Sequence, residues 1–446
     1  MKKWLFTLII VLTTNLVLFA QNLETGIKAL YYEKYSEAQS ILETIVNKNP
    51  NDTKAAYWLG QVYLQNNNFP DRITKAKQIY QESLSKNFNS PYLLVGMGEI
   101  DLLTNNDIPS AKQKFEQAIL SSKEDPDILN AVGRANASGK NTTGDPSYSI
   151  EILKKTAMQD PKNPDIEYNL ALNSLKLNPN DQKTDIDYLL KAITLDNKYS
   201  KAYFTIGKIY YDVNPILAND NFLKSMAMDS NYAPSYRWAF NLAVKNKNYI
   251  LAEKYIKKYI ALSEDKTLSQ YYLAWIEIQN KDYASAQKNI SIYLSNSSLK
   301  QIQNGAYILA AKAFSPIVDS SKFYYEKAIK TDTIHRLEAI DSLINIYGRD
   351  KDTMNMFIWM KKKYISILAS ENEYKNETLT PQICTLALKN IPFFKDKEEY
   401  AFIDSIFRNY VQLYPNDEFG YYGIVKISMG IDSSYQKALQ PINSYI

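Results

Sequence analysis

The chain has 446 residues, of which 45% are apolar and 22% charged, and a composition with 13 Gly and 16 Pro excludes collagen-like, proline-rich and disordered chains. A single histidine and a single cysteine exclude an internal disulfide and a structural zinc site built from several Cys or His. The formal net charge of +4 is too small to indicate a nucleic-acid partner.

The first 20 residues have the layout of a secretory signal peptide. Lys2 and Lys3 give a positive start, residues 5–19 carry no charge, and Ala20 precedes a polar sequence. This apolar run is shorter than the roughly 20 residues that a membrane-spanning helix needs. We therefore expect cleavage of residues 1–20 to leave an exported protein, periplasmic or secreted, without an integral membrane span. An uncleaved N-terminal anchor is the alternative.

A helical pattern recurs along the rest of the chain. Three segments begin with Tyr-x-x-Ala, at 35–38, 249–252 and 283–286, and larger apolar residues follow each Ala four and seven positions later. A second pattern precedes it, Leu-Gly-x-x-Tyr at 59–63 and Ile-Gly-x-x-Tyr at 206–210. Both patterns have helical spacing, and short runs of Pro, Asn and Asp separate them.

These residues resemble the tetratricopeptide repeat family, in which helix A carries Leu-Gly-x-x-Tyr and helix B carries Ala-x-x-x-Phe. The resemblance implies an all-α fold, a right-handed superhelical solenoid of antiparallel helix pairs with about 11 to 12 units. The small residues Gly60 and Gly207 would let helix A lie close against its partner. We expect regular repeats over residues 21–300 and divergent helical repeats over 301–446.

Two polar stretches, at 137–149 and 176–184, are predicted to be surface loops between helices. The first contains Ser-Gly-Lys-Asn at 138–141, which is similar to a phosphate-binding loop. Five residues separate Gly133 from Gly139, however, and Asn141 stands where that loop needs Ser or Thr. We therefore interpret this stretch as a turn.

No group of residues favours catalysis. Asp125 and Asp127 flank a proline at a predicted helix start, where Asp caps the helix. His335 lies at the start of a predicted helix, and Cys384 lies in an apolar helical run, which predicts a buried thiol. The prediction is a non-catalytic protein that needs no cofactor or metal. The alternative is an enzyme whose catalytic region occupies residues 301–446.

The resemblance further implies that the A helices line a concave groove. The family's groove positions, and related positions in the less regular units, fall on Tyr57, Gln61, Tyr92, Asn130, Arg134, Tyr168, Phe204, Lys208, Tyr211, Arg237, Asn241, Tyr271 and Trp275. Aromatic rings beside Arg and Asn favour peptide binding. The carboxylate clamp of some members is not supported, because Tyr272 stands where that clamp needs Asn.

We therefore predict a scaffold of the bacterial cell envelope that binds proteins or extended peptides and no nucleic acid. A periplasmic chaperone or a component of secretion or assembly machinery is the alternative. A homodimer through the terminal repeats is left open. Four Asp-Ser/Thr-aliphatic tripeptides resemble an O-glycosylation sequence of some Gram-negative bacteria, and their candidate acceptors are Thr333, Ser342, Thr353 and Ser405.

Overall fold

The computed structural model describes residues 23–67, 69–297, 302–368, 373–394 and 397–432. All regular structure in these ranges is helical, and none of it is β-strand. The chain forms two compact units, which are divided between Ser269 and Gln270, within α15 (Lys266–Gln279).

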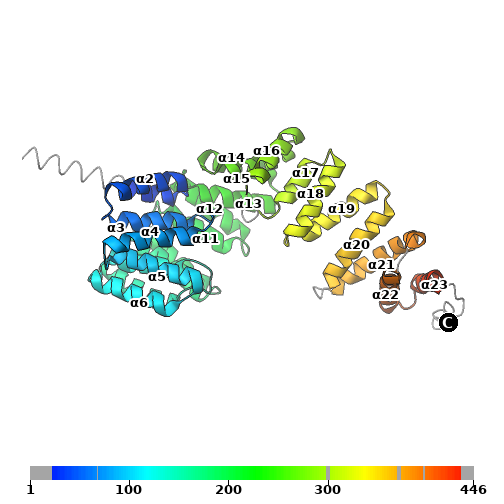
Figure 1. Cartoon of the computed structure of the whole chain (residues 1–446), viewed down its shortest axis with the longest axis horizontal. Helices are drawn as coiled ribbons and strands as arrows, with labels where there is room; N and C mark the ends of the chain where they lie inside the picture. Colours follow the sequence, from blue (N-terminus) through cyan, green and yellow to red (C-terminus); the bar gives the residue numbers. More distant parts are fainter. Residues whose placement is uncertain (1–22, 68, 298–301, 369–372, 395–396, 433–446) are drawn as a thin grey trace, which may run out of the picture. The chain divides into compact units, whose positions relative to one another are not determined.

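The first unit is a stack of helix pairs that follow one another in chain order, as α2 to α6 do in Figure 1. A helix over 23–31 pairs with α2, and each later pair joins an odd-numbered A helix to the even-numbered B helix after it. The helices are α2 (Tyr35–Lys48), α3 (Thr53–Gln65), α4 (Arg72–Lys86), α5 (Pro91–Asn105), α6 (Ile108–Ser121), α7 (Pro126–Ala137), α8 (Pro146–Gln159), α9 (Pro164–Leu177), α10 (Gln182–Leu195), α11 (Ser200–Tyr210), α12 (Pro215–Met228), α13 (Ala233–Lys245) and α14 (Tyr249–Leu262).

The second unit, taken by itself, is also built from consecutive helix pairs. Its helices after α15 are α16 (Tyr283–Asn296), α17 (Ala306–Ala313), α18 (Val318–Thr331), α19 (Arg336–Arg349), α20 (Thr353–Leu368), α21 (Glu373–Asn390), the short 3-10 helix η1 (Ile391–Phe393), α22 (Lys397–Leu413) and α23 (Glu418–Asp432). Eleven pairs followed by α23 agree with the predicted number of units. The predicted all-α array of helix pairs is confirmed.

Glycine on an A helix allows a large side chain of the B helix to lie directly against its backbone. A Cβ atom on Gly60 would lie 2.2 Å from the ring of Tyr80, and one on Gly207 would lie 2.5 Å from the ring of Phe222. Both rings are fully buried. The ring therefore fills the volume that a side chain on the A helix would need, which is the packing that the small-residue pattern predicts.

Several helices begin at a polar cap that the sequence marks. The carboxylates of Asp52 and Asp107 accept hydrogen bonds from the third backbone N–H beyond them, and Asp125 accepts one from the N–H of Asp127 at 2.8 Å. His335 is the residue before α19, and the Cys384 thiol is fully buried. The predictions for Asp125, His335 and Cys384 are confirmed.

The two polar stretches differ from their prediction. The loop between α7 and α8 covers only residues 138–145, and Lys176 belongs to α9 instead of a turn. Its buried Nζ donates to the backbone oxygens of Asn136 at 2.7 Å and Ser138 at 2.5 Å. Burial lowers the pKa of Lys176 to about 8. The sequence around Lys176 indicates a polar turn. It does not show that the backbone oxygens of Asn136 and Ser138, 40 and 38 residues earlier, accept hydrogen bonds from the lysine.

Candidate binding surface of the first unit

Side chains from A helices two repeats apart meet on one face of the first unit. The guanidinium carbon of Arg134 on α7 lies 4.6 Å from the ring centroid of Trp58 and 5.9 Å from that of Tyr57, both on α3. Lys54 of α3 also pairs with Asp127 of α7, at 3.0 Å. Packed helices lie about 8–10 Å apart. Contacts that reach across α5 therefore place this face on the inside of the curve.

Lys201 of α11 extends the same face. Its Nζ lies 5.2 Å from the ring centroid of Tyr168 on α9 and 5.5 Å from that of Tyr31 in the first helix. Burial lowers the pKa of Lys201, the Asp165 carboxylate opposes this in part, and the nearby Arg134 guanidinium lowers the pKa further. The ammonium group is therefore held between rings, where water solvates it poorly.

Lys208 occupies a similar position two turns along α11. Its Nζ lies 5.7 Å from the ring centroid of Phe204 and 5.3 Å from that of Trp238 on α13. Burial lowers its pKa, and the neighbouring Arg237 lowers it further. The ring of Tyr211 lies 5.2 Å from that of Trp238, edge to face.

These contacts define a surface that we term the inner wall. It consists of the ring-bearing and cationic side chains Tyr31, Trp58, Arg134, Tyr168, Lys201, Phe204, Lys208, Arg237 and Trp238.

A buried polar network joins the A helices of neighbouring repeats. Gln61 donates to the Glu99 carboxylate at 2.6 Å, and Asn169 donates to the side-chain oxygen of Asn130 at 2.7 Å. Burial raises the pKa of Glu99. Gln61 and Asn130 are 1% and 6% exposed, and Tyr57 is fully buried. These three predicted groove residues are therefore part of the packing between helices, and the more exposed residues around them form the surface.

The other predicted groove residues take varied positions. Tyr92 on α5 is half-buried and donates to Asp127 at 3.2 Å, and its burial raises its pKa to about 12. Arg237 on α13 pairs with Glu33 at 3.7 Å. Asn241, also on α13, is exposed.

Tyr271 and Trp275 lie on the part of α15 that belongs to the second unit. The ring of Tyr271 is 5.4 Å from that of Tyr293 on α16, and burial raises the pKa of Tyr271 to about 12. The other eleven predicted groove residues lie in the first unit. Their role in binding stays a prediction.

Sequence reasoning missed four residues of the inner wall, namely Tyr31, Trp58, Lys201 and Trp238. One signal was available, because Lys201 and Lys208 are seven residues apart and therefore share a helix face. No local signal places Tyr31 beside Lys201, since that contact depends on the curvature of the whole unit.

The first helix pair contacts the sixth and seventh pairs. The Tyr32 hydroxyl donates to the Asp229 carboxylate at 2.9 Å, and the backbone N–H of Ser36 donates to the Glu264 carboxylate at 2.5 Å. The contacts of Tyr32, Glu33 and Ser36 with Asp229, Arg237 and Glu264 are termed the seam.

Glu264 supplies the N-terminal cap of α2. The residue before that helix, Lys34, makes no side-chain cap, whereas the Glu264 carboxylate accepts from the backbone N–H groups of Ser36 and, at 3.4 Å, Glu37. A carboxylate at this end also interacts favourably with the helix dipole. Beside the seam lies a pocket of about 330 Å³ whose lining includes Tyr32, Tyr35, Arg237, Tyr259 and Glu264.

Comparison with known families agrees with this architecture. Residues 23–83, which cover the first pair of helices and most of the second, match the family model of the tetratricopeptide repeat. This segment therefore belongs to the tetratricopeptide repeat family. No curated protein matches it.

Solved structures similar to this chain are remote in sequence. MamA is 21% identical, and the match covers 38% of this chain and 95% of MamA with a TM-score of 0.30. Yeast Tom70 is 13% identical, with 95% and 99% covered and a TM-score of 0.33. The human IFIT1 dimer with m7Gppp-AAAA is 13% identical, with 92% and 95% covered and a TM-score of 0.45.

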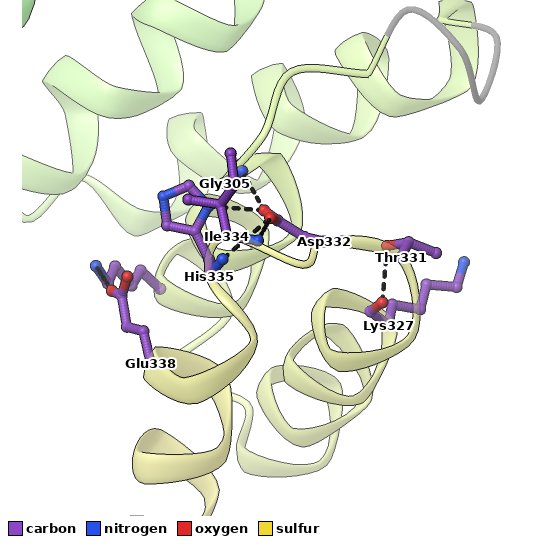
Figure 2. Close-up of polar contacts among 8 residues, drawn as sticks. Gly305, Lys327, Thr331, Asp332, Ile334, His335 and Glu338 are labelled. Carbon is purple, nitrogen blue, oxygen red and sulfur yellow. Dashed lines mark hydrogen bonds and ion pairs between the residues drawn. The ribbon is translucent and has the colours of Figure 1, made fainter. Parts of the chain in front are cut away.

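The repeats of the second unit carry the tripeptides with the four candidate acceptors. Thr333 is exposed at the turn before α19, next to the buried Asp332. Figure 2 shows the carboxylate of Asp332 accepting from the backbone N–H groups of Gly305, Ile334 and His335, and contacting the His335 ring at 2.8 Å. This aspartate therefore has a structural role as a helix cap.

The hydroxyls of the other candidate acceptors form hydrogen bonds within the repeats. Ser342 donates to the backbone oxygen of Glu338 at 2.9 Å, and Ser405 donates to a backbone oxygen in the same helix. Thr353 donates to the side chain of Asn390 at 3.0 Å. O-glycosylation of Thr333, Ser342, Thr353 and Ser405 stays a prediction.

Within the described ranges, three or more His, Cys, Asp or Glu side chains never come together in a way that could hold a metal ion. The helices of the same ranges are all too short or too polar to cross a membrane. The leader predicted at 1–20 lies outside them.

Proposed function

We propose that this chain is a non-catalytic scaffold that binds proteins or extended peptides on the inner wall of its first unit. The observation that carries the proposal is the convergence of Tyr168, Phe204 and Trp238 with Lys201 and Lys208 on one inward-facing surface. Half-buried rings supply a large contact area with few rotatable bonds, and the cations add hydrogen-bond donors.

The network behind the inner wall supports a binding role because it keeps the rings in place before a ligand arrives. Asn169 joins α9 to α7, and Asn173 donates to the backbone oxygen of Gly133 at 2.9 Å. Gln61 joins α3 to α5 in the same way. A surface that is ordered in the free protein loses less conformational entropy when it binds.

The proposed compartment is the bacterial cell envelope, and the support for it is the leader at residues 1–20. Fractionation of the native cells tests it, since recovery of the mature chain from the periplasm is the expected result. Recovery from the cytoplasm with the leader intact would contradict the proposal.

Affinity purification with crosslinking mass spectrometry tests the binding surface. We expect the double variant Tyr168→Ala/Phe204→Ala to recover less than about a tenth of the partner that the unmodified chain recovers, because two aromatic anchors are removed. The control Phe88→Ala/Ile250→Ala removes two side chains that are 85% and 89% exposed, and full recovery is expected.

Equal recovery by both double variants would show that the inner wall is not the binding surface. Many unfolded clients in place of one stoichiometric partner would instead indicate a periplasmic chaperone or a secretion component.

A further inference from the structure

The inner wall contains three cations that form no salt bridge with a described carboxylate. Among the described residues, Arg134, Lys201 and Lys208 have no carboxylate oxygen within 4.0 Å. All three lie against aromatic rings, and Arg134 and Lys201 are partly buried whereas Lys208 is exposed. Buried charges in proteins are ordinarily paired, so Arg134 and Lys201 suit an anionic ligand, and the accessible Lys208 can contact the same ligand.

The carboxylates nearby have other partners. Asp165 of α9 accepts a hydrogen bond from the hydroxyl of Tyr199, and Glu33 pairs with Arg237. Their presence also limits the positive field of the inner wall. A ligand with a few spaced negative charges therefore fits this surface better than a continuous phosphate backbone, whose binding relies on many cations.

Three buried groups that can donate a hydrogen bond have no partner of normal geometry among the described residues. They are the Nε of Arg134 and the Nε1 of Trp58 on the inner wall, and the hydroxyl of Tyr57 behind it. The guanidinium of Arg134 lies on the face of the Trp58 ring and close to the Tyr57 ring, so these donors belong to one place. Buried donors usually have a hydrogen-bond partner, and ligand oxygens would supply one here.

The two lysines of α11 set the spacing that a ligand must match. Lys201 and Lys208 are seven residues apart, which places their Cα atoms about 10.5 Å apart along one helix face. A polyproline II segment repeats every three residues, so side chains three residues apart lie on the same side at about 9 Å. Aromatic-lined grooves suit this conformation, because its cost in entropy is low.

We propose that the inner wall binds an acidic polypeptide segment in an extended, polyproline II-like conformation. Successive carboxylates three residues apart contact Lys201 and Lys208, and Phe204 and Trp238 pack against the residues between them. The inference rests on the proposed function of the inner wall and specifies the class of peptide.

Fluorescence anisotropy with a fluorescein-labelled (Glu-Pro-Pro)4 peptide tests the proposal on the purified chain. We expect Lys201→Gln/Lys208→Gln to weaken binding at least about tenfold, since two charge-assisted contacts are lost. The control Lys154→Gln/Lys254→Gln removes the same charge from exposed positions on α8 and α14, and should change binding less than about twofold. The uncharged probe (Gln-Pro-Pro)4 should bind at least about tenfold more weakly than the acidic one.

Three results would overturn the proposal. One is no binding of (Glu-Pro-Pro)4, and another is equal loss in the two double variants. The third is tighter binding of dT12 than of the peptide, with the same dependence on Lys201, because that would assign the surface to nucleic acid. If the cellular partner is lost in Tyr168→Ala/Phe204→Ala but kept in Lys201→Gln/Lys208→Gln, the scaffold function stands and the acidic ligand class is wrong.

Discussion

Both units have an apolar core, but the first unit buries more polar side chains than the second among the described residues. Between the A helices of the first unit, Gln61 bonds to Glu99 and Asn130 to Asn169, and all four are buried. The core of the second unit is formed by large apolar side chains, including Ile340, Leu343, Phe357, Ile403 and Phe407. Hydrogen bonds require particular residues at particular positions, whereas apolar cores tolerate exchange if total volume is kept.

This difference explains why the repeat pattern is clear at one end of the chain and faint at the other. The family model matches residues 23–83, which lie wholly in the first unit. In the second unit α17 packs alanines, such as Ala310 and Ala311, where the first unit has Gly60 or Gly207 on its A helices. The helix pairs persist because a small residue is still present, although the motif is lost.

The largest difference in stability between the two units is expected from the substitution Gly60→Ala. The added Cβ would lie 2.2 Å from the buried Tyr80 ring, so we expect the first unit to lose about 3 kcal/mol of stability through overpacking. In the second unit, Gly348→Ala meets only the end of Met356, at 3.4 Å, and should raise stability by about 0.5 kcal/mol through helix propensity. Hydrogen exchange resolved by segment measures both changes, and equal protection in the two variants would contradict the comparison.

A pH-dependent effect of intermediate size is expected from Lys176. Its pKa is about 8 in the folded chain and near 10.4 in an unfolded one, so between these values the unfolded chain binds more protons. Stability of the first unit should therefore rise with pH from about 8 to 9.5, by at most about 1.4 kcal/mol per pH unit. Lys176→Met should reduce this rise in urea unfolding, and Lys201 and Lys208, whose pKa values burial also lowers, account for the rise that remains.

The second unit serves as an internal control for that measurement, because no lysine is buried among its described residues. Unfolding should be measured only below about pH 10, because above that pH the buried tyrosines lower the stability of the folded chain as pH rises. Burial raises the pKa of Tyr92 to about 12, for example, so folding loses stability as the unfolded tyrosine ionises first. The same slope in Lys176→Met and the unmodified chain would show that another group is responsible.

The smallest effect is expected from Glu264→Gln at the seam. Loss of the negative charge at the start of α2 should lower the free energy of local opening there by about 1 kcal/mol. This corresponds to about fivefold faster exchange of the amide hydrogens of Ser36 and Glu37. Exchange in the second unit should stay the same. Unchanged exchange at Ser36 would mean that the seam does not cap the helix in solution.

The sequence was sufficient for the features that depend on local spacing. The helix pairs, the glycine contacts of Gly60 and Gly207, the cap at Asp125 and the burial of Cys384 follow from residues close together in the chain. The inner wall could be predicted only in part, since Phe204 and Lys208 occupy known groove positions but the contact between Tyr31 and Lys201 depends on accumulated curvature.

The seam has a consequence for the order in which the protein forms. The amide of Ser36 and the carboxylate of Glu264 are 228 residues apart. At about 5–20 residues per second, a ribosome needs roughly 10–45 s to add that length. During this interval the first helix pair has been synthesised without its cap. The aromatic side chains of the inner wall are then exposed to solvent and to other proteins. A chain that is exported while still being made would complete its first unit only after most of its length has passed the membrane.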